Sequence, residues 1–138
     1  MKQEALEVLR NRRAIRAYKP DQITEEALNA KVLNNPAAHP YYGAPTILLI
    51  FETQACVTHE LDGAAVCTNM LNAAYAVGLG SCWIHRCKQM FELPEGKALL
   101  KQWGLPETLT GVASIALGYA DCDLPTAKPR KDGYIVKV

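Results

Sequence analysis

Residues 60–84, ELDGAAVCTNMLNAAYAVGLGSCWI, decide the fold. The part from Glu60 to Val77 is rich in Ala, Leu, Met and Asn and carries no charge after Asp62, which predicts a long, mostly buried helix. Two glycines, the first at Gly78, then interrupt the helical pattern, because glycine permits the tight turn that joins a helix to a strand. The apolar residues 81–84 predict a buried strand directly after this turn.

The sequence on both sides of this stretch alternates between helical and strand patterns. Helices are expected at residues 4–11, 24–33 and 94–103, and strands at residues 46–51 and 111–119. The long helix and the small number of strands favour an α+β sandwich with a helix through its centre over a doubly wound sheet. With 138 residues and no internal repeat, the chain is expected to form one domain, residues 1–138.

Composition excludes several classes of protein. A net charge of +1 lacks the positive excess of a general nucleic-acid binder. No stretch has the roughly 20 apolar residues that a membrane helix needs, and the charged N-terminus does not resemble a signal peptide. We therefore expect a cytoplasmic protein with no nucleic-acid or membrane partner. The five cysteines form no CxxC pair and the histidines are far apart, so neither a metal site nor a reactive thiol is expected.

Two basic clusters are candidates for chemistry. Arg12, Arg13 and Arg16 follow the first helix, and residues 128–131 lie in the C-terminal tail. Each cluster has an ordinary explanation, since cations at the end of a helix complement its dipole and a short charge run is usually solvated. Brought together, they would make a phosphate site, because guanidinium groups match phosphate oxygens. The two glycines at 78 and 80 are not a dinucleotide fingerprint, because the third glycine and the preceding strand are missing.

Four motifs occur in an order typical of a known family. They are RRAIRAY at residues 12–18, AAYAVGLGSCWI at 73–84, IALGY at 115–119 and PTAKPR at 125–130. Together they resemble the FMN-dependent nitroreductase family over most of the chain. The resemblance implies a nitroreductase-like α+β sandwich, with an antiparallel or mixed sheet flanked by helices and a long central helix. It also implies a homodimer that binds FMN where the two subunits meet.

The resemblance further implies an oxidoreductase. In this family NAD(P)H reduces the flavin, and a small-molecule electron acceptor then takes the electrons in a ping-pong cycle. The acceptors include nitroaromatics, quinones and related compounds. Because the redox chemistry belongs to the flavin, no catalytic side chain is expected.

The resemblance assigns cofactor contacts residue by residue. Arg12 would hold the FMN phosphate, and Arg16 would reach the pyrimidine end of the ring, where positive charge stabilises the reduced flavin. Arg13 and Ala14 would lie along the ribityl chain. The other expected contacts are Lys128 and Arg130, which would complete the phosphate clamp, and the backbone of Gly80, Ser81, Cys82 and Trp83 near the isoalloxazine ring.

The chain departs from the family after the second expected helix. Members usually carry a loop of the type Pro-Ser-x-x-Asn-x-Gln-x-Trp there, followed by a strand and a helix. Here Ala30 passes directly to Lys31, so a few dozen residues are absent. The segment is disordered and omitted, deleted in nature, or deliberately removed, and we favour the first explanation. Its loss should weaken FMN binding and expose a sheet edge.

Two alternatives to the oxidoreductase stay open. One is a degenerate family member that binds flavin weakly or not at all and acts as a flavin carrier or interaction scaffold without turnover. The absent loop favours it, and so does Ala14, where members often have serine. The other is a dehalogenase-like or flavin-fragmenting relative, but no segment of this sequence matches the lid that such enzymes need.

Overall fold

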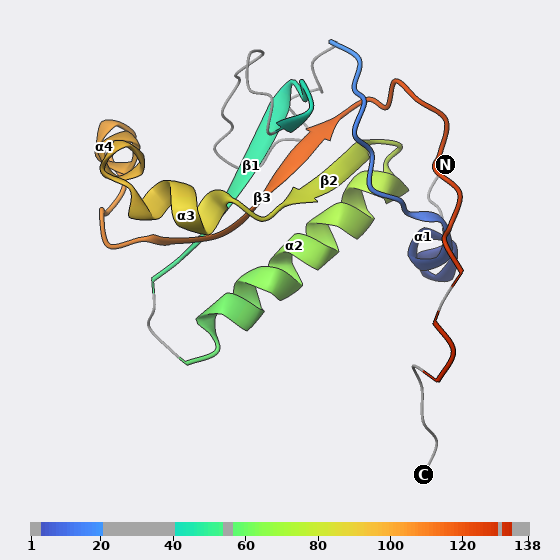
Figure 1. Ribbon diagram of the computed structural model, residues 1–138, viewed down its shortest axis with the longest axis horizontal. Helices are drawn as coiled ribbons and strands as arrows, with labels where there is room; N and C mark the ends of the chain where they lie inside the picture. Colours follow the sequence, from blue (N-terminus) through green and yellow to red (C-terminus); the bar gives the residue numbers. More distant parts are fainter. Residues whose placement is uncertain (1–3, 21–40, 54–56, 130, 134–138) are drawn as a thin grey trace.

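The computed structural model describes residues 4–20, 41–53, 57–129 and 131–133 (Figure 1). The expected helix at residues 24–33 and the junction between Ala30 and Lys31 lie outside these residues. The strands are β1 (Thr46–Glu52), β2 (Gly80–Ile84) and β3 (Thr110–Gly118). The helices are α1 (Ala5–Asn11), α2 (His59–Ala76), α3 (Cys87–Glu92) and α4 (Pro94–Gln102).

The three strands form one antiparallel sheet in the order β1-β3-β2. The last strand in the chain is therefore the middle strand of the sheet, where Ile115 lies opposite Leu48 on one side and Trp83 on the other. The middle strand is almost entirely buried, which explains why its sequence is a continuous apolar run rather than an alternating one.

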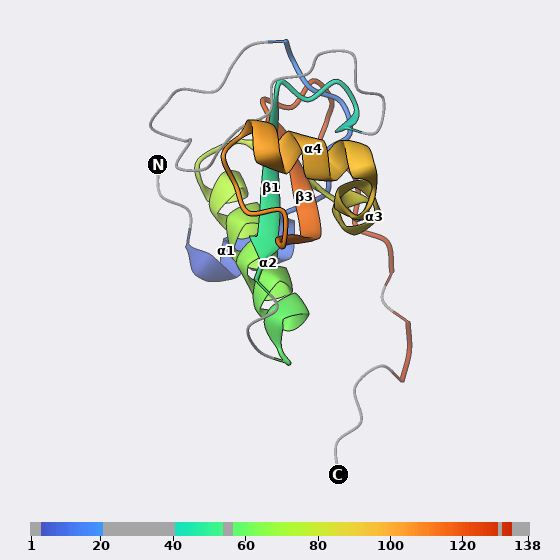
Figure 2. The ribbon, with the colours of Figure 1, turned by 90° about the vertical axis from the view of Figure 1, so that its left-hand side faces the viewer.

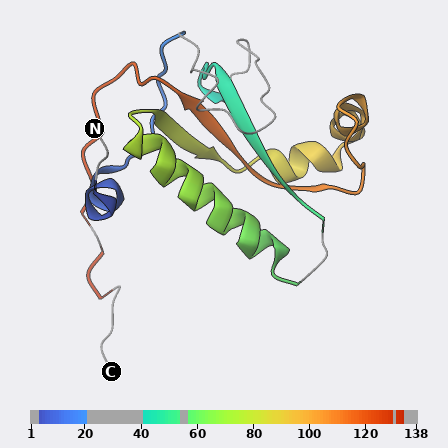
Figure 3. The same ribbon diagram turned by 180° about the vertical axis from the view of Figure 1, so that it is seen from behind.

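Helix α2 lies along one face of the sheet (Figures 1 and 3). Cys67, Leu71 and Ala74 point from the helix into a core that includes Ile115 of β3. The helix begins and ends within one residue of the expected bounds, but only one of its sides is buried. Its outer side carries exposed apolar residues such as Val66. In the described part of the chain, no helix combines the length and the apolar character that crossing a membrane requires.

Helices α3 and α4 pack at one end of the sheet, against the ends of β1 and β3 (Figure 2). Phe91 and Leu100 form the centre of this packing, and the ring of Phe91 meets that of Phe51 edge to face at 4.6 Å between centroids. Helix α3 was not expected from the sequence. It has only six residues and no side-chain cap, so it gives too little periodic signal to be recognised.

We predict that Gly96→Ala destabilises the protein, although alanine normally stabilises a helix by roughly 0.5–1 kcal/mol relative to glycine. A Cβ atom at Gly96 would lie 2.1 Å from the Met90 carbonyl oxygen and 2.8 Å from the Phe91 Cα, so α4 would have to move away from α3. The expected loss is about 1–3 kcal/mol in the free energy of unfolding, measured by urea denaturation. Lys101→Ala, at an exposed position of α4, is the control, and unchanged or increased stability of Gly96→Ala would refute the close approach.

Candidate functional site

The arginine-containing segment that follows α1 attaches to the edge of β2. Ile15 N–H donates a hydrogen bond of 3.0 Å to the Ser81 carbonyl oxygen, and Ala14 forms a parallel bridge with Ser81. Gly80 permits this approach, because a Cβ there would lie only 3.1 Å from the Ile15 side chain. Residues 12–16 and 80–83, which are far apart in the sequence, therefore lie side by side.

The C-terminal tail returns to the same segment. Asp121 N–H donates to the Ala17 carbonyl oxygen and Lys19 N–H donates to the Tyr119 carbonyl oxygen, both at 2.9 Å. From there the tail extends away from the sheet, and Figure 2 shows it on the opposite side of the molecule from α1. An open cavity of about 1000 Å³ lies between the two segments, lined by Arg13, Ala14 and Arg16 on one side and by residues 125–129 and 131–133 on the other. We call it the basic cavity.

The basic cavity carries an uncompensated positive charge. Its four basic side chains, Arg13, Arg16, Lys128 and Lys131, face one carboxylate, Asp132. None of the four forms an ion pair with a carboxylate in the part of the chain that the structure describes. Clustered cations repel one another, so such an arrangement favours an anionic ligand with several oxygens, such as a phosphate.

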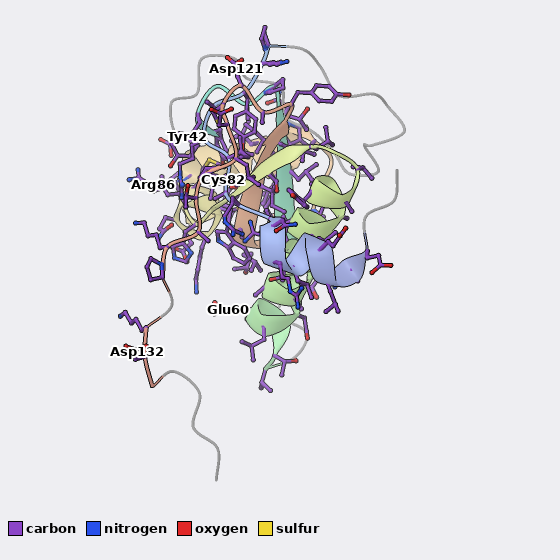
Figure 4. All side chains as sticks on the ribbon, turned by 90° about the vertical axis from the view of Figure 1, so that its right-hand side faces the viewer. Tyr42, Glu60, Cys82, Arg86, Asp121 and Asp132 are labelled. Atoms are coloured by element: carbon purple, nitrogen blue, oxygen red, sulfur yellow. The ribbon has the colours of Figure 1, made fainter. Side chains whose placement is uncertain are left out.

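A second cavity of about 370 Å³ provides a contrast. It lies at the start of α2, well away from Tyr42 and Cys82 (Figure 4), and it is also lined by lysines. There Lys88 forms an ion pair with Glu60, and Lys97 Nζ donates to the Glu107 and Leu109 carbonyl oxygens at 2.6 and 3.1 Å. The lysines of this cavity already have partners within the chain, so the basic cavity is the stronger candidate for an anion site.

Arg13 has both a structural role and free donor capacity. Its Nη1 donates to the Arg10 and Arg12 carbonyl oxygens, each at 2.7 Å, and so closes the C-terminal end of α1. This is the ordinary explanation that the sequence allowed. Its buried Nε has no hydrogen-bond partner among the described residues, so the fold leaves this donor unsatisfied.

Arg16 projects from the extended segment and lies against an aromatic ring. Its Cζ is 5.9 Å from the centroid of the Tyr42 ring, which is within reach of a cation–π interaction. Its positive charge, like that of Arg12, acts on Cys82 and partly offsets the increase that burial causes in the pKa of this thiol. Burial also raises the pKa of Tyr18, which donates from Oη to the Ile15 carbonyl oxygen at 2.7 Å.

The side chains of β2 alternate between the two faces of the sheet. Trp83 packs against the core beneath α2, whereas Cys82 lies on the opposite face with Ala14 and Tyr18. Ser81 is buried, and its Oγ has no hydrogen-bond partner among the described residues. Cys82 and Ile84 are therefore the members of this strand whose side chains lie on the same face as Ala14 and Tyr18.

Two cysteines of the core are not suited to act as nucleophiles. Burial raises the pKa of the Cys67 thiol to about 11 and that of Cys87 to about 12. At neutral pH both are protonated, and the thiolate is the reactive form. The surroundings of these two thiols therefore do not activate them as nucleophiles.

Some of the expected cofactor contacts line the basic cavity, and others lie outside its lining. Arg13, Ala14, Arg16 and Lys128 line the basic cavity. Arg12, at the end of α1, is not part of the lining, and residues 80–83 support the arginine segment from the sheet. Arg130 lies outside the described residues.

Two residues at the site were not among the expected cofactor contacts. Lys131 belongs to the basic cluster in the tail that is a candidate from the sequence, but the family motifs did not assign it a contact. Tyr42 is beside Arg16, and nothing in the local pattern signals this contact, because it depends on how two distant segments fold together.

The sequence matches a family model, and the fold matches solved structures. A search of curated proteins finds no match to the sequence. The model of the Nitroreductase family matches residues 29–119, more than half of the chain.

Three solved structures have the same fold over nearly the whole chain. A nitroreductase with bound FMN from Bacteroides fragilis is 25% identical with a TM-score of 0.87, and 99% of each chain is covered. A nitroreductase with bound FMN from Desulfitobacterium hafniense is 19% identical with a TM-score of 0.82, and an FMN-dependent nitroreductase from Clostridium difficile is 20% identical with a TM-score of 0.80. Both of these alignments cover 100% of each chain. By the family model and by its fold, this chain belongs to the nitroreductase family.

Proposed function

We propose that the protein is an FMN-dependent oxidoreductase that takes electrons from NAD(P)H and passes them to nitroaromatic, quinone or related acceptors. The observation that carries the proposal is the basic cavity, whose four cations have no ion-pair partner among the described residues. Membership of the nitroreductase family and the FMN bound to the Bacteroides fragilis protein support the choice of FMN as the ligand.

The residues of the basic cavity fit the phosphate end of FMN. Lys128 and Lys131 in the tail line the cavity opposite Arg13 and Arg16, so a phosphate would be approached by cations from both sides. Each contact would be a charge-assisted hydrogen bond, the stronger kind in proteins. The cavity volume is also within the range of small-molecule and cofactor sites.

The protein contributes binding and charge, and bound FMN supplies two-electron redox chemistry. Arg16 would place its guanidinium near the pyrimidine end of the ring, where reduction adds negative charge, and so favour the reduced state. Arg12, which acts electrostatically on Cys82, would add to the same positive field. Gly80, Ser81, Cys82 and Trp83 would hold the arginine segment in place beside the ring.

We also propose that the protein works as a homodimer through the outer side of α2. The sequence contains no charged residue between Asp62 and His85, yet only one side of the helix is buried. Val66 and Val77, eleven residues apart and therefore on the same side of the helix, are 47% and 70% exposed, and Leu9 of α1 is 61% exposed. An uncharged face with exposed apolar side chains favours contact with another protein surface.

A second candidate function is a weak flavin carrier or scaffold without turnover. The observation that favours it is Ala14, which lines the basic cavity with a methyl group and donates no side-chain hydrogen bond. Part of the donor capacity of Arg13 is also used within the chain. Both features would lower the affinity for FMN without removing the site.

The visible absorption spectrum separates the two functions. We expect the purified protein to show flavin bands, or to acquire them when FMN is added, and we expect NADPH or NADH to bleach these bands in the absence of oxygen. Recovery of the bands after addition of a quinone or a nitroaromatic would demonstrate the full cycle. Flavin bands that neither nucleotide bleaches would favour the flavin carrier without turnover, and a protein that takes up no FMN would exclude the oxidoreductase and favour an interaction scaffold.

Lys128→Ala should weaken FMN binding about tenfold, because it removes one charge-assisted contact to the phosphate. The dissociation constant is measured by quenching of flavin fluorescence, and its dependence on salt should become shallower in the variant. Lys101→Ala removes an exposed lysine at the other end of the molecule and serves as the matched control. Equal affinity of Lys128→Ala and the wild type would exclude the tail from the site.

Val66→Asp should convert the dimer to a monomer, because it places a charge in the proposed contact on α2. Analytical ultracentrifugation of the wild type and the variant measures the effect. Leu93→Asp is the control, since Leu93 is an exposed apolar residue at the start of α4 and an aspartate is well tolerated at a helix N-cap. A Val66→Asp protein that stays dimeric, or a wild type that is monomeric, would refute this interface.

A further inference from the structure

The turn that precedes β1 has an unusual residue at its first central position. Ala44 N–H donates to the Tyr41 carbonyl oxygen at 3.0 Å, and Tyr42 and Gly43 both have positive φ angles, 56° and 69°. A turn with two positive φ angles of this kind favours asparagine or glycine at these positions. Tyr42 is the only described residue other than glycine with a positive φ, and a bulky side chain is disfavoured there.

The turn is held in place by its neighbours rather than by Tyr42 itself. Tyr41 is buried and its Oη lies 3.1 Å from Ser114 Oγ, which donates to the Ile84 carbonyl oxygen at 3.2 Å. Ala44, on the other side, is completely buried. The Tyr42 side chain is 43% exposed, so its ring contributes little to the core.

The contact that this ring makes is with Arg16, at 5.9 Å from its centroid. Arg16 lines the basic cavity and Tyr42 does not, so the ring supports the guanidinium from outside the cavity wall. Arg16 forms no ion pair with any carboxylate of the described residues. An aromatic face can hold a guanidinium without cancelling its charge, which an aspartate or glutamate in the same place would do.

We propose that Tyr42 is a positioning residue that holds the Arg16 guanidinium at the wall of the basic cavity with its full charge available to the ligand. The contact itself does not depend on the identity of the ligand. Its consequence for the flavin rests on the proposed function, in which Arg16 favours the reduced state of bound FMN. The disfavoured backbone of Tyr42 is then the cost of keeping an aromatic ring at this position.

The contact is tested first by the stability of the full chain. A double-mutant cycle of Tyr42→Leu and Arg16→Ala in urea denaturation should give a coupling of about twofold to fivefold in the ratio of folded to unfolded protein. Tyr42→Phe keeps the ring and should keep the coupling. Asparagine adopts a positive φ more readily than tyrosine, so Tyr42→Asn removes the ring and the backbone strain together. Comparing it with Tyr42→Leu, which removes only the ring, separates the energy of the strain from the energy of the Arg16 contact. Additive effects of Tyr42→Leu and Arg16→Ala would overturn the proposal.

The effect of Tyr42 on the flavin is tested by measuring the midpoint potential of bound FMN. This potential gives the preference of the protein for reduced over oxidised FMN. Arg16→Ala should reduce this preference about threefold to tenfold. Tyr42→Leu and Tyr42→Asn should shift it in the same direction, and Tyr42→Phe should leave it unchanged. A shift in Arg16→Ala without any shift in Tyr42→Leu would contradict the positioning role. If the wild type binds no FMN, the proposed function fails, and the unfolding cycle alone decides whether Tyr42 holds Arg16.

Discussion

The hydrogen bond from Ile15 N–H to the Ser81 carbonyl oxygen is the constraint on which the site depends. It fixes an extended segment along β2, and in extended backbone successive side chains point to opposite sides. Ile15 is 4% exposed and turns into the core, so its neighbours Ala14 and Arg16 must turn outward to the cavity. One backbone contact at the sheet edge thus sets the direction in which the positive charge points.

The positive charge is concentrated at the site and does not extend over the whole chain. The whole chain has a net charge of +1, yet the basic cavity gathers Arg16 and Lys128 beside two further cations and one carboxylate. An anion bound among these cations would add a favourable charge interaction and so stabilise the folded protein. The aromatic contact at Tyr42 follows the same logic, because it orders Arg16 without neutralising it.

Sequence patterns were sufficient for most elements and insufficient for the site. The apolar run of β3 and the long pattern of α2 predicted both elements closely, since burial imposes their composition. Helix α3 is too short to show a period. Arg13 and Lys128 line the same cavity because of backbone pairings between segments about a hundred residues apart. No local sequence pattern encodes such pairings. Motif resemblance could nominate these residues, but it could not show that Arg12 lies outside the lining.

Contacts within one chain do not explain why the exposed side of α2 carries so little charge. The helix contains no charge after Asp62, as if it were buried on all sides, but the sheet covers only the side that carries Cys67 and Leu71. Burying a fully exposed leucine or valine contributes about 1.5–3 kcal/mol, so leaving Val66 and Val77 partly in water forgoes a share of that gain. A sequence that needed only to face solvent on this side would tolerate lysine and glutamate. Their absence is the reason to expect a second protein surface against α2.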